Sequence, residues 1–140
     1  SGMEKIVIDR GLKEYSIEDK NGNVLGSFEI NPADPGIERR YKEVVNDLNH
    51  LTDIISDDMP QDEAFEKMED FICQKLDYLF GNAISKNFFS IISPFSVLAN
   101  GDFYFENVFS AIGALGEQET GERYEKLATK IDDYTKKYHK

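Results

Sequence analysis

Cysteine and histidine are the residues of this chain that could most readily do chemistry. Cys73 is the single cysteine, and His50 and His139 are the two histidines. A cysteine nucleophile needs a base held at hydrogen-bond distance, and a lone cysteine in a helical pattern, far in sequence from both histidines, is more typical of a core or boundary residue. The same three residues lack the short spacings of a zinc site. We expect neither a thiol enzyme nor a zinc centre.

One segment spaces its polar side chains like the start of a calcium-binding loop, with Asp19, Asn21 and Asn23 at alternate positions. A calcium loop of this class also requires glycine at its sixth position and a bidentate glutamate at its twelfth. Val24 and Ile30 occupy those two positions. We expect a hairpin turn here instead, because the Asn-Gly pair at 21–22 supplies the positive φ angles of a tight turn.

Glycines and neighbouring carboxylates do not form a catalytic motif either. No Gly-Lys-Ser/Thr of a phosphate-binding loop follows Gly113, Gly116 or Gly121, and we interpret these glycines as helix ends and close packing points. General acid-base catalysis needs a carboxyl group in a desolvated site, whereas Asp57 and Asp58 lie in the most charged stretch of the chain. We predict no enzymatic activity, and no catalytic, cofactor-binding or metal-binding residue.

The charge of the chain restricts the partners that it can bind. The formal net charge is −11, and residues 53–70 contain eight acidic side chains against a single basic one, Lys67. Such a surface repels nucleic-acid phosphates and anionic lipid headgroups. We expect no nucleic acid and no membrane as partner. A basic protein partner and simple solubility both remain as explanations of the acidic face.

Length and hydropathy favour a single domain over residues 3–140. The chain has 140 residues, 40% of them hydrophobic, which suits one core better than two. Ser1 and Gly2 precede Met3, and we interpret them as a cloning remnant. No signal-peptide pattern opens the chain, and no apolar run has the length of a membrane span. The expected location is the cytoplasm.

The first 31 residues alternate apolar and polar side chains as strands do. The strand across the Asn-Gly turn is followed by Pro32, which stops it. A hairpin is expected, and a third strand near Ile6 and Ile8 would extend it to a small sheet. The alternating apolar or small residues are Ile6, Ile8, Tyr15, Ile17, Val24, Gly26, Phe28 and Ile30.

Apolar residues at steps of three and four predict two long helices after the strands. Asp34 before Pro35 is a helix start signal, and one apolar stripe then continues over residues 37–55. A second helix is expected to begin near Gln61 and to end at Gly81. The two helices could pair in antiparallel orientation.

The remainder of the chain predicts a short helix, a compact loop and two more helices, which begin near Phe103 and Thr120. The expected fold is therefore α+β. An N-terminal antiparallel β-hairpin or small three-stranded sheet, at 3–31, packs on a bundle of three to four helices, at 35–140. The last helix presents a narrow apolar seam of Tyr124, Leu127, Ile131, Tyr134 and Tyr138.

Several short stretches, spread in order over most of the chain, form a recognisable set. They are VIDRG at 7–11, EYSIEDKNGNVLG at 14–26, FEINPADPGI at 28–37, DYLFG at 77–81, SPFS at 93–96, FENVFSAI at 105–112 and YTKKYHK at 134–140. With these stretches the chain resembles small proteins of the tail modules of long-tailed bacteriophages and prophages of Gram-positive bacteria. Such proteins are regarded as tail assembly chaperones or tail components, and the stretches carry no catalytic signature.

This resemblance implies a chaperone in the cytoplasm of the bacterial host cell. Its partner would be the tape-measure protein, a long and largely helical chain whose apolar stripes must stay covered until tube subunits polymerise around it. Contacts with that partner would come from aromatic side chains that remain at the surface. The alternative is that these side chains fill the core. The candidates are Phe88, Phe89, Phe95, Phe103, Tyr104, Tyr134 and Tyr138.

Two other functions fit the sequence. A structural tail component would assemble with copies of itself as a homo-oligomer, through the edge of its N-terminal strands. An acidic inhibitor that mimics nucleic acid would account for the net charge of −11. Apolar residues interleave with the acids at helical spacing, at Phe65, Met68 and Ile72, which favours an ordinary amphipathic helix over such a mimic.

Overall fold

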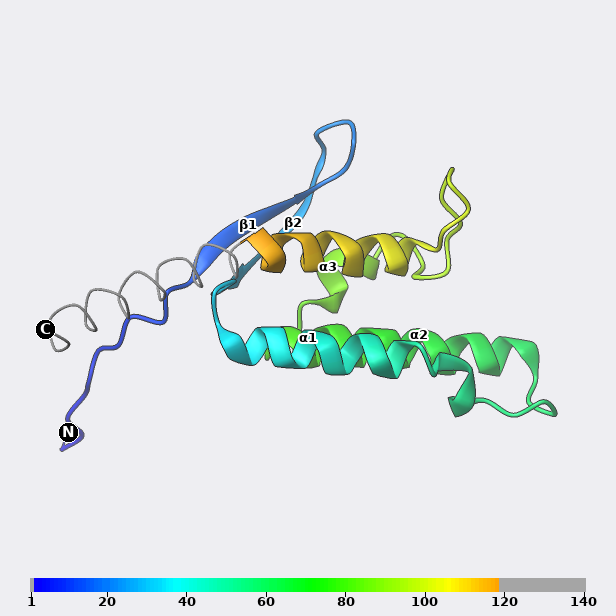
Figure 1. Cartoon of the computed structure of the whole chain (residues 1–140), viewed down its shortest axis with the longest axis horizontal. Coiled ribbons are helices and arrows are strands. Elements are labelled where there is room, and N and C mark those ends of the chain that lie inside the picture. The colour runs from blue at the N-terminus through cyan, green and yellow to red at the C-terminus, as the bar shows by residue number, and fades with distance from the viewer. Residues whose placement is uncertain (1, 119–140) are drawn as a thin grey trace, which may run out of the picture.

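The computed structural model describes residues 2–118, which adopt an α+β fold (Figure 1). A β-hairpin lies on one side of the molecule and two long helices, α1 (Pro35–Leu48) and α2 (Gln61–Phe80), lie side by side on the other. The helix at residues 104–118, coloured yellow to orange, runs between them. One core joins these elements, and its most buried members include Ile30, Val44, Ile72, Leu76, Leu79, Val108, Phe109 and Ile112.

The hairpin consists of β1 (Lys13–Glu18) and β2 (Val24–Ile30), paired in antiparallel register. The prediction of a hairpin across the Asn-Gly turn is confirmed by this pairing, although only Gly22, with a φ of +82°, has the positive φ angle expected of both residues. Tyr15 stacks on Phe28, its partner across the two strands, with ring centroids 5.5 Å apart. Successive side chains of a strand point to opposite faces, so every second residue of β2 faces the helices.

The third strand that the sequence allowed is not present, and the small three-stranded sheet is therefore wrong for the described residues. Residues 3–10, which we call the N-terminal arm, have no regular secondary structure. Ile6, Val7 and Ile8 are 84%, 88% and 70% exposed. The arm extends away from the hairpin (Figure 1), so its strand-like residues lie beyond the reach of the sheet.

Helix α1 (Pro35–Leu48) starts at the predicted signal. Asp34 is the N-cap, and its Oδ1 accepts a hydrogen bond from the Gly36 N–H at 2.8 Å. Because proline lacks an N–H and has a helical φ, Pro35 suits the first helical position. This start directs the helix back under the hairpin.

The end of α1 differs from the prediction, because the apolar stripe over residues 37–55 is not one helix. The α-helix ends at Leu48, and a short 3-10 helix, η1 (Leu51–Ile54), follows it. The His50 N–H bonds to the Asp47 carbonyl, a tighter i to i−3 contact. Leu51 is still buried in the core, which explains why the sequence pattern continued past the end of the helix.

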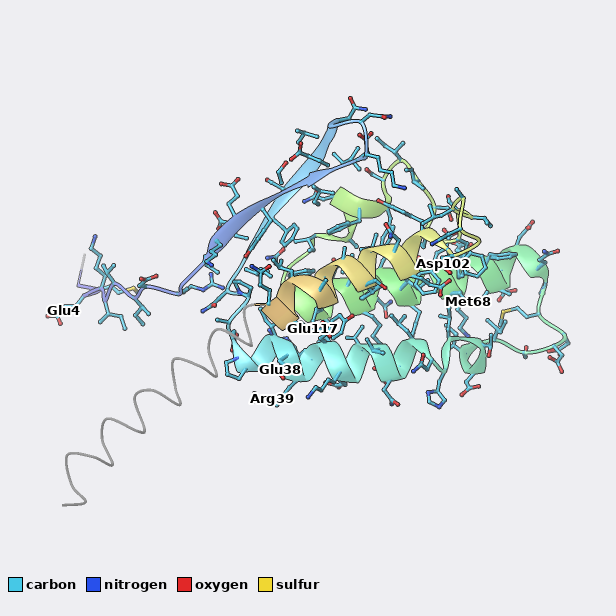
Figure 2. All side chains as sticks on the ribbon, turned by 45° about the horizontal axis from the view of Figure 1, so that its top comes forward. Glu4, Glu38, Arg39, Met68, Asp102 and Glu117 are labelled. Carbon is cyan, nitrogen blue, oxygen red and sulfur yellow. The ribbon has the colours of Figure 1, made fainter. Side chains whose placement is uncertain are left out.

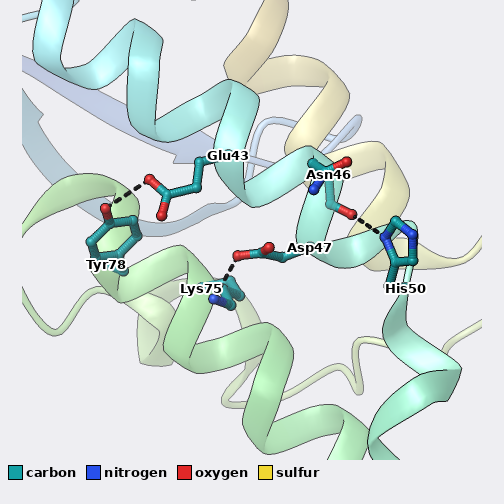
Figure 3. A network of polar contacts seen from close by, with 6 residues as sticks. All are labelled: Glu43, Asn46, Asp47, His50, Lys75 and Tyr78. Carbon is teal, nitrogen blue, oxygen red and sulfur yellow. Dashed lines mark hydrogen bonds and ion pairs between the residues drawn. The ribbon is translucent and has the colours of Figure 1, made fainter.

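Helix α2 (Gln61–Phe80) has the predicted bounds and ends at Gly81, whose φ of +73° is left-handed. It runs antiparallel to α1, and three polar contacts join the pair. The Lys75 ammonium lies 2.7 Å from the Asp47 carboxylate, and the Tyr78 hydroxyl donates to Glu43 at 2.9 Å (Figure 3). Nearer the start of α1, the Arg40 guanidinium donates to a carbonyl of α2 at 3.2 Å.

The predicted short helix after Gly81 is α3 (Ser85–Phe89). A loop then leads to the helix at residues 104–118, which begins one residue after the predicted start. The expected helix from Thr120 and its seam of apolar residues lie outside the described residues. None of the helices within residues 2–118 is long and apolar enough to cross a membrane.

Candidate protein-binding site

Cys73 is a free thiol that lies half-buried on α2. Burial raises the pKa of the Cys73 thiol, and the carboxylates of Asp77, Asp70 and Glu69 add to the rise against a hydrogen bond with Ser85. The His50 imidazole instead lies at the end of α1, with Nδ1 2.9 Å from the Asn46 carbonyl oxygen (Figure 3). A thiol that stays protonated is a poor nucleophile. His139 lies outside the described residues.

The polar residues of the hairpin turn are occupied by the turn itself. The Asp19 carboxylate accepts hydrogen bonds from the Asn21 and Asn23 N–H groups at 2.8 and 2.9 Å, and from the Asn23 side-chain amide at 2.9 Å. These bonds, the Asn23 side chain first, lower the pKa of Asp19. Within residues 2–118, no three His, Cys, Asp or Glu side chains are grouped to hold a metal ion.

Four of the aromatic residues that the sequence offered as partner contacts pack against the core, and three of them, Phe88, Phe89 and Tyr104, lie in contact with one another. Phe88 contacts both Phe28 and Phe89, with ring centroids 5.9 and 6.3 Å apart. Tyr104 meets Phe89 edge to face, and its hydroxyl donates to the Phe88 carbonyl at 3.0 Å. All three candidates are half-buried, so they offer only part of their surface to a partner. Tyr134 and Tyr138 lie outside the described residues.

The other two candidates, Phe95 and Phe103, belong to a compact aromatic cluster near the N-terminal end of α2. The Phe95 ring meets the rings of Phe65, Phe103 and Phe105 edge to face, with centroids 5.5, 5.4 and 5.6 Å apart. Phe103 also stacks on Phe105 at 6.0 Å. Phe65 and Phe103 remain 40% and 39% exposed. We call these four residues the aromatic patch.

The backbone that carries the patch is held by a regular set of hydrogen bonds. Val97 and Phe103 form an isolated antiparallel bridge, closed by a turn in which Gly101 has a φ of +89°. The Tyr104 N–H bonds to the Ser96 carbonyl at 2.8 Å, and the Phe105 N–H bonds to the Pro94 carbonyl at 2.9 Å. The rings are therefore positioned before any partner arrives, which lowers the entropic cost of binding.

Carboxylates accept hydrogen bonds from residues in or next to the patch. Glu69 on α2 accepts a hydrogen bond from the Ser93 hydroxyl at 2.8 Å, and Glu106 accepts one from the Phe103 N–H at 2.9 Å. Asp102 stands beside Phe103 in the chain and is exposed at the start of the helix at 104–118 (Figure 2). An apolar centre with an acidic rim can receive an apolar segment that carries basic flanks.

Sequence patterns missed Phe65 and Phe105 as members of this patch. Phe65 fits the apolar face of α2 together with Met68 and Ile72, which predicts a core residue. Phe65 lies on α2 N-terminal to the stretch that contacts α1. That stretch includes Lys75 and Tyr78, which bond to side chains of α1. No signal in the sequence shows how far one helix extends past the other, so the exposure of Phe65 required the fold.

A second apolar recess lies where β2, α1 and the helix at 104–118 meet. It has a volume of about 680 Å³, and its lining includes Ile30, Ile37, Tyr41 and Ile112. Its lining also includes Glu38 and Glu117 (Figure 2), and Lys42 of the same lining forms an ion pair with Glu38 at 3.7 Å. The Tyr41 hydroxyl donates to a main-chain carbonyl at 2.9 Å, and burial, with a smaller effect of Glu117, raises the pKa of Tyr41.

Comparison with known proteins finds no relative of this chain. No protein-family model, no curated protein and no solved structure matches the chain significantly.

Proposed function

We propose that this protein is a non-catalytic tail assembly chaperone of a bacteriophage or prophage, active in the cytoplasm of the host cell. In this proposal the aromatic patch binds apolar helical segments of the tape-measure protein. The sequence resemblance to tail-module proteins suggests the process, and the patch suggests the way in which the partner is bound.

The observation that carries the proposal is the exposure of aromatic rings on an ordered support. Phe65 and Phe103 keep about two fifths of their surface in water, although the backbone beneath them is fixed by hydrogen bonds. Covering the exposed part of one such ring stabilises a complex by roughly 2 kcal/mol. Rings held at a prearranged position are typical of residues that dominate the energy of an interface.

Charge determines which apolar segments the patch accepts. The acidic stretch 53–70 includes the first half of α2, from which Phe65 projects. A segment with lysine or arginine beside its apolar stripe gains attraction at this rim, whereas an acidic segment is repelled. The tape-measure segments bound by this protein should therefore combine an apolar stripe with basic flanks.

Co-expression with overlapping fragments of the tape-measure protein from the same gene cluster tests this function. The proposal predicts that at least one fragment that precipitates alone stays soluble and co-purifies with the protein. If no fragment binds, and the protein forms rings or tubes with itself, the chaperone function is wrong.

Variants of the patch make the experiment specific to the site. Replacing both exposed rings, Phe65→Ser with Phe103→Ser, should release the fragment into the insoluble fraction. Val24→Ser is the matched control, because Val24 is 68% exposed at the hairpin, away from the patch, and its loss should leave the fragment soluble. Retention of the fragment by the double variant would assign binding to another surface.

A structural tail component remains the second candidate, and one observation favours it. The exposed Ile6, Val7 and Ile8 of the N-terminal arm are suited to contact between copies of the chain. The two functions differ in their products. A chaperone is absent from purified virions, whereas a structural component is present there at a fixed copy number.

A further inference from the structure

The N-terminal arm presents an apolar, strand-forming sequence that its own chain leaves uncovered. Ile6, Val7 and Ile8 are consecutive β-branched residues, the type most enriched in strands. Each of them is at least 70% exposed, and the arm has no regular secondary structure. An extended apolar segment of this kind is suited to strand addition, in which it pairs with the open edge of another strand.

The base of the arm is held so that the arm points away from the rest of the molecule. The Asn31 side-chain amide donates to the Arg10 carbonyl at 3.1 Å. Gly11, which follows, has a φ of +66°, a left-handed conformation that favours glycine. The arm extends from this anchor to Glu4 at one end of the molecule, whereas Asp102, beside the aromatic patch, lies toward the other end (Figure 2). The arm therefore does not reach the patch of its own chain.

The loop that carries the aromatic patch offers an open strand edge. Val97 and Phe103 form an isolated antiparallel bridge, and backbone hydrogen bonds of 2.8 Å join the residues on either side of them. They are therefore a non-hydrogen-bonded pair, in which the N–H and carbonyl of each residue point away from the partner. Within residues 2–118, no group bonds to the N–H or carbonyl of Val97. Val97 is also 70% exposed, so a strand from another copy can approach this edge.

The side chains of the arm match those around this edge. The two side chains of an antiparallel pair lie on one face, so Val97 lies next to the exposed ring of Phe103. Ile6 and Ile8 are two residues apart, so they share one face of an extended arm and can cover both. The two basic and two acidic side chains of the arm cancel, whereas the whole chain has a net charge of −11. The carboxylates next to the patch therefore do not repel the arm.

We propose that the N-terminal arm of one copy pairs with the outer edge of Val97 in a second copy and covers its aromatic patch. The arm and the patch are different surfaces, so each copy can give its arm to one neighbour and receive an arm from another. Such head-to-tail contacts generate rings or filaments, whereas a two-fold contact would stop at a dimer. This inference goes beyond the chaperone function and does not depend on it.

Sedimentation of the full chain over a range of concentrations tests the association. Species larger than a dimer should accumulate as the concentration rises. The double variant Ile6→Asp with Ile8→Asp should raise the apparent dissociation constant about tenfold or more, because it brings unpaired charge into the contact. Its unfolding temperature should not change, since both residues are exposed and lie outside the core. A chain that stays monomeric at all concentrations, or an arm variant that associates as the wild type does, would overturn the proposal.

Val97→Asp tests the receiving edge and should weaken the association to a similar extent. Val24→Asp is the matched control, because it places the same charge at a β-branched residue of the hairpin that is 68% exposed. It should associate as the wild type does. Association that Val97→Asp leaves unchanged would place the receiving edge elsewhere and would also overturn the proposal.

Mixing the two defective proteins tests the head-to-tail order, at a concentration where each alone is monomeric. The arm variant keeps an intact receiving edge and Val97→Asp keeps an intact arm, so one productive contact remains between them. A dimer with one copy of each should form. It should not grow further, because its remaining arm and its remaining edge are both defective. Monomers alone, or larger mixed assemblies, would contradict the head-to-tail contact.

Discussion

At the scale of single residues, substitutions at two glycines form a matched pair. Both Gly113 and Gly116 lie within the helix at residues 104–118. A Cβ at Gly113 would collide with the Tyr41 ring and hydroxyl, whereas no described atom lies within 4 Å of one at Gly116. The prediction that these glycines provide close packing is confirmed at Gly113. Gly121 lies outside the described residues.

The pair predicts opposite effects on the free energy of unfolding. Gly113→Ala should lower it by about 1–2 kcal/mol, because the collision displaces Tyr41 from its hydrogen bond and outweighs the gain in helix propensity. Gly116→Ala should raise it by about 0.5–1 kcal/mol through helix propensity alone. Urea unfolding of both variants measures the difference, and equal effects would contradict the packing of Tyr41 on Gly113.

The Cys73 thiol gives a prediction about pH. Because burial raises its pKa, the thiolate fraction at neutral pH is smaller than in an unfolded chain. Alkylation of the folded protein should therefore be slow at pH 7–8. Its rate should rise only when the pH exceeds the ordinary pKa range of a thiol. Labelling in urea is the control, since unfolding restores ordinary reactivity. A folded-state rate that is half-maximal below the usual thiol pKa would contradict this account.

At the scale of elements, Asp77 joins the end of α2 to the start of α3. Its Oδ1 accepts hydrogen bonds from the Ile84 and Ser85 N–H groups at 2.9 and 2.7 Å, and Oδ2 accepts one from the Ser85 hydroxyl at 3.1 Å. Ser85 is buried, so water cannot replace these bonds freely. This single carboxylate positions α3 and therefore the Phe88 and Phe89 rings.

Asp77→Ala should accordingly lower the free energy of unfolding by about 2–3 kcal/mol, because two main-chain N–H groups lose their acceptor. Asp77→Asn keeps one carbonyl oxygen and should lose less. The exposed contact between Tyr78 and Glu43 provides the comparison, and Tyr78→Phe should change stability far less than Asp77→Ala, because water can replace that contact. Thermal or urea unfolding measures all three, and an Asp77→Ala loss as small as that of Tyr78→Phe would contradict the capping role.

Elements governed by local chemistry were predictable from the sequence. The Asn-Gly turn, the Asp34 cap of α1 and the Gly81 end of α2 each depend on a few neighbouring residues. The end of α1 at Leu48 was not predictable, because Leu51 enters the core from a 3-10 turn and continues the apolar stripe.

The candidate site was less predictable than the fold. Phe95 and Phe103 were chosen from the sequence, but Phe65 joins them only because its end of α2 extends past the contact with α1. Phe88 and Phe89 are aromatic residues of the same kind and pack against the core outside the patch, whereas Phe95 packs against the core within it. Aromatic residues at helical spacing therefore do not distinguish a surface from a core until the helices are placed.

At the scale of the whole molecule, the net charge of −11 should affect how fast a client binds. If the acidic rim steers a basic segment, the association rate of a tape-measure fragment should fall as salt rises from about 0.05 to 0.5 M, since screening shortens the reach of the field. The dissociation rate, governed by the buried rings, should change little. Stopped-flow kinetics at several salt concentrations measure both, and a salt-independent association rate would argue against electrostatic steering.

The most direct test of the aromatic patch as the binding site is a calorimetric titration of a short tape-measure peptide, chosen from the bound fragment and soluble alone, into the wild type, Phe103→Ser and Val24→Ser. Phe103→Ser should raise the dissociation constant about tenfold or more, which corresponds to about 1.4 kcal/mol, and Val24→Ser should change it by less than about twofold. Unchanged affinity in a folded Phe103→Ser protein would show that the aromatic patch is not the binding site.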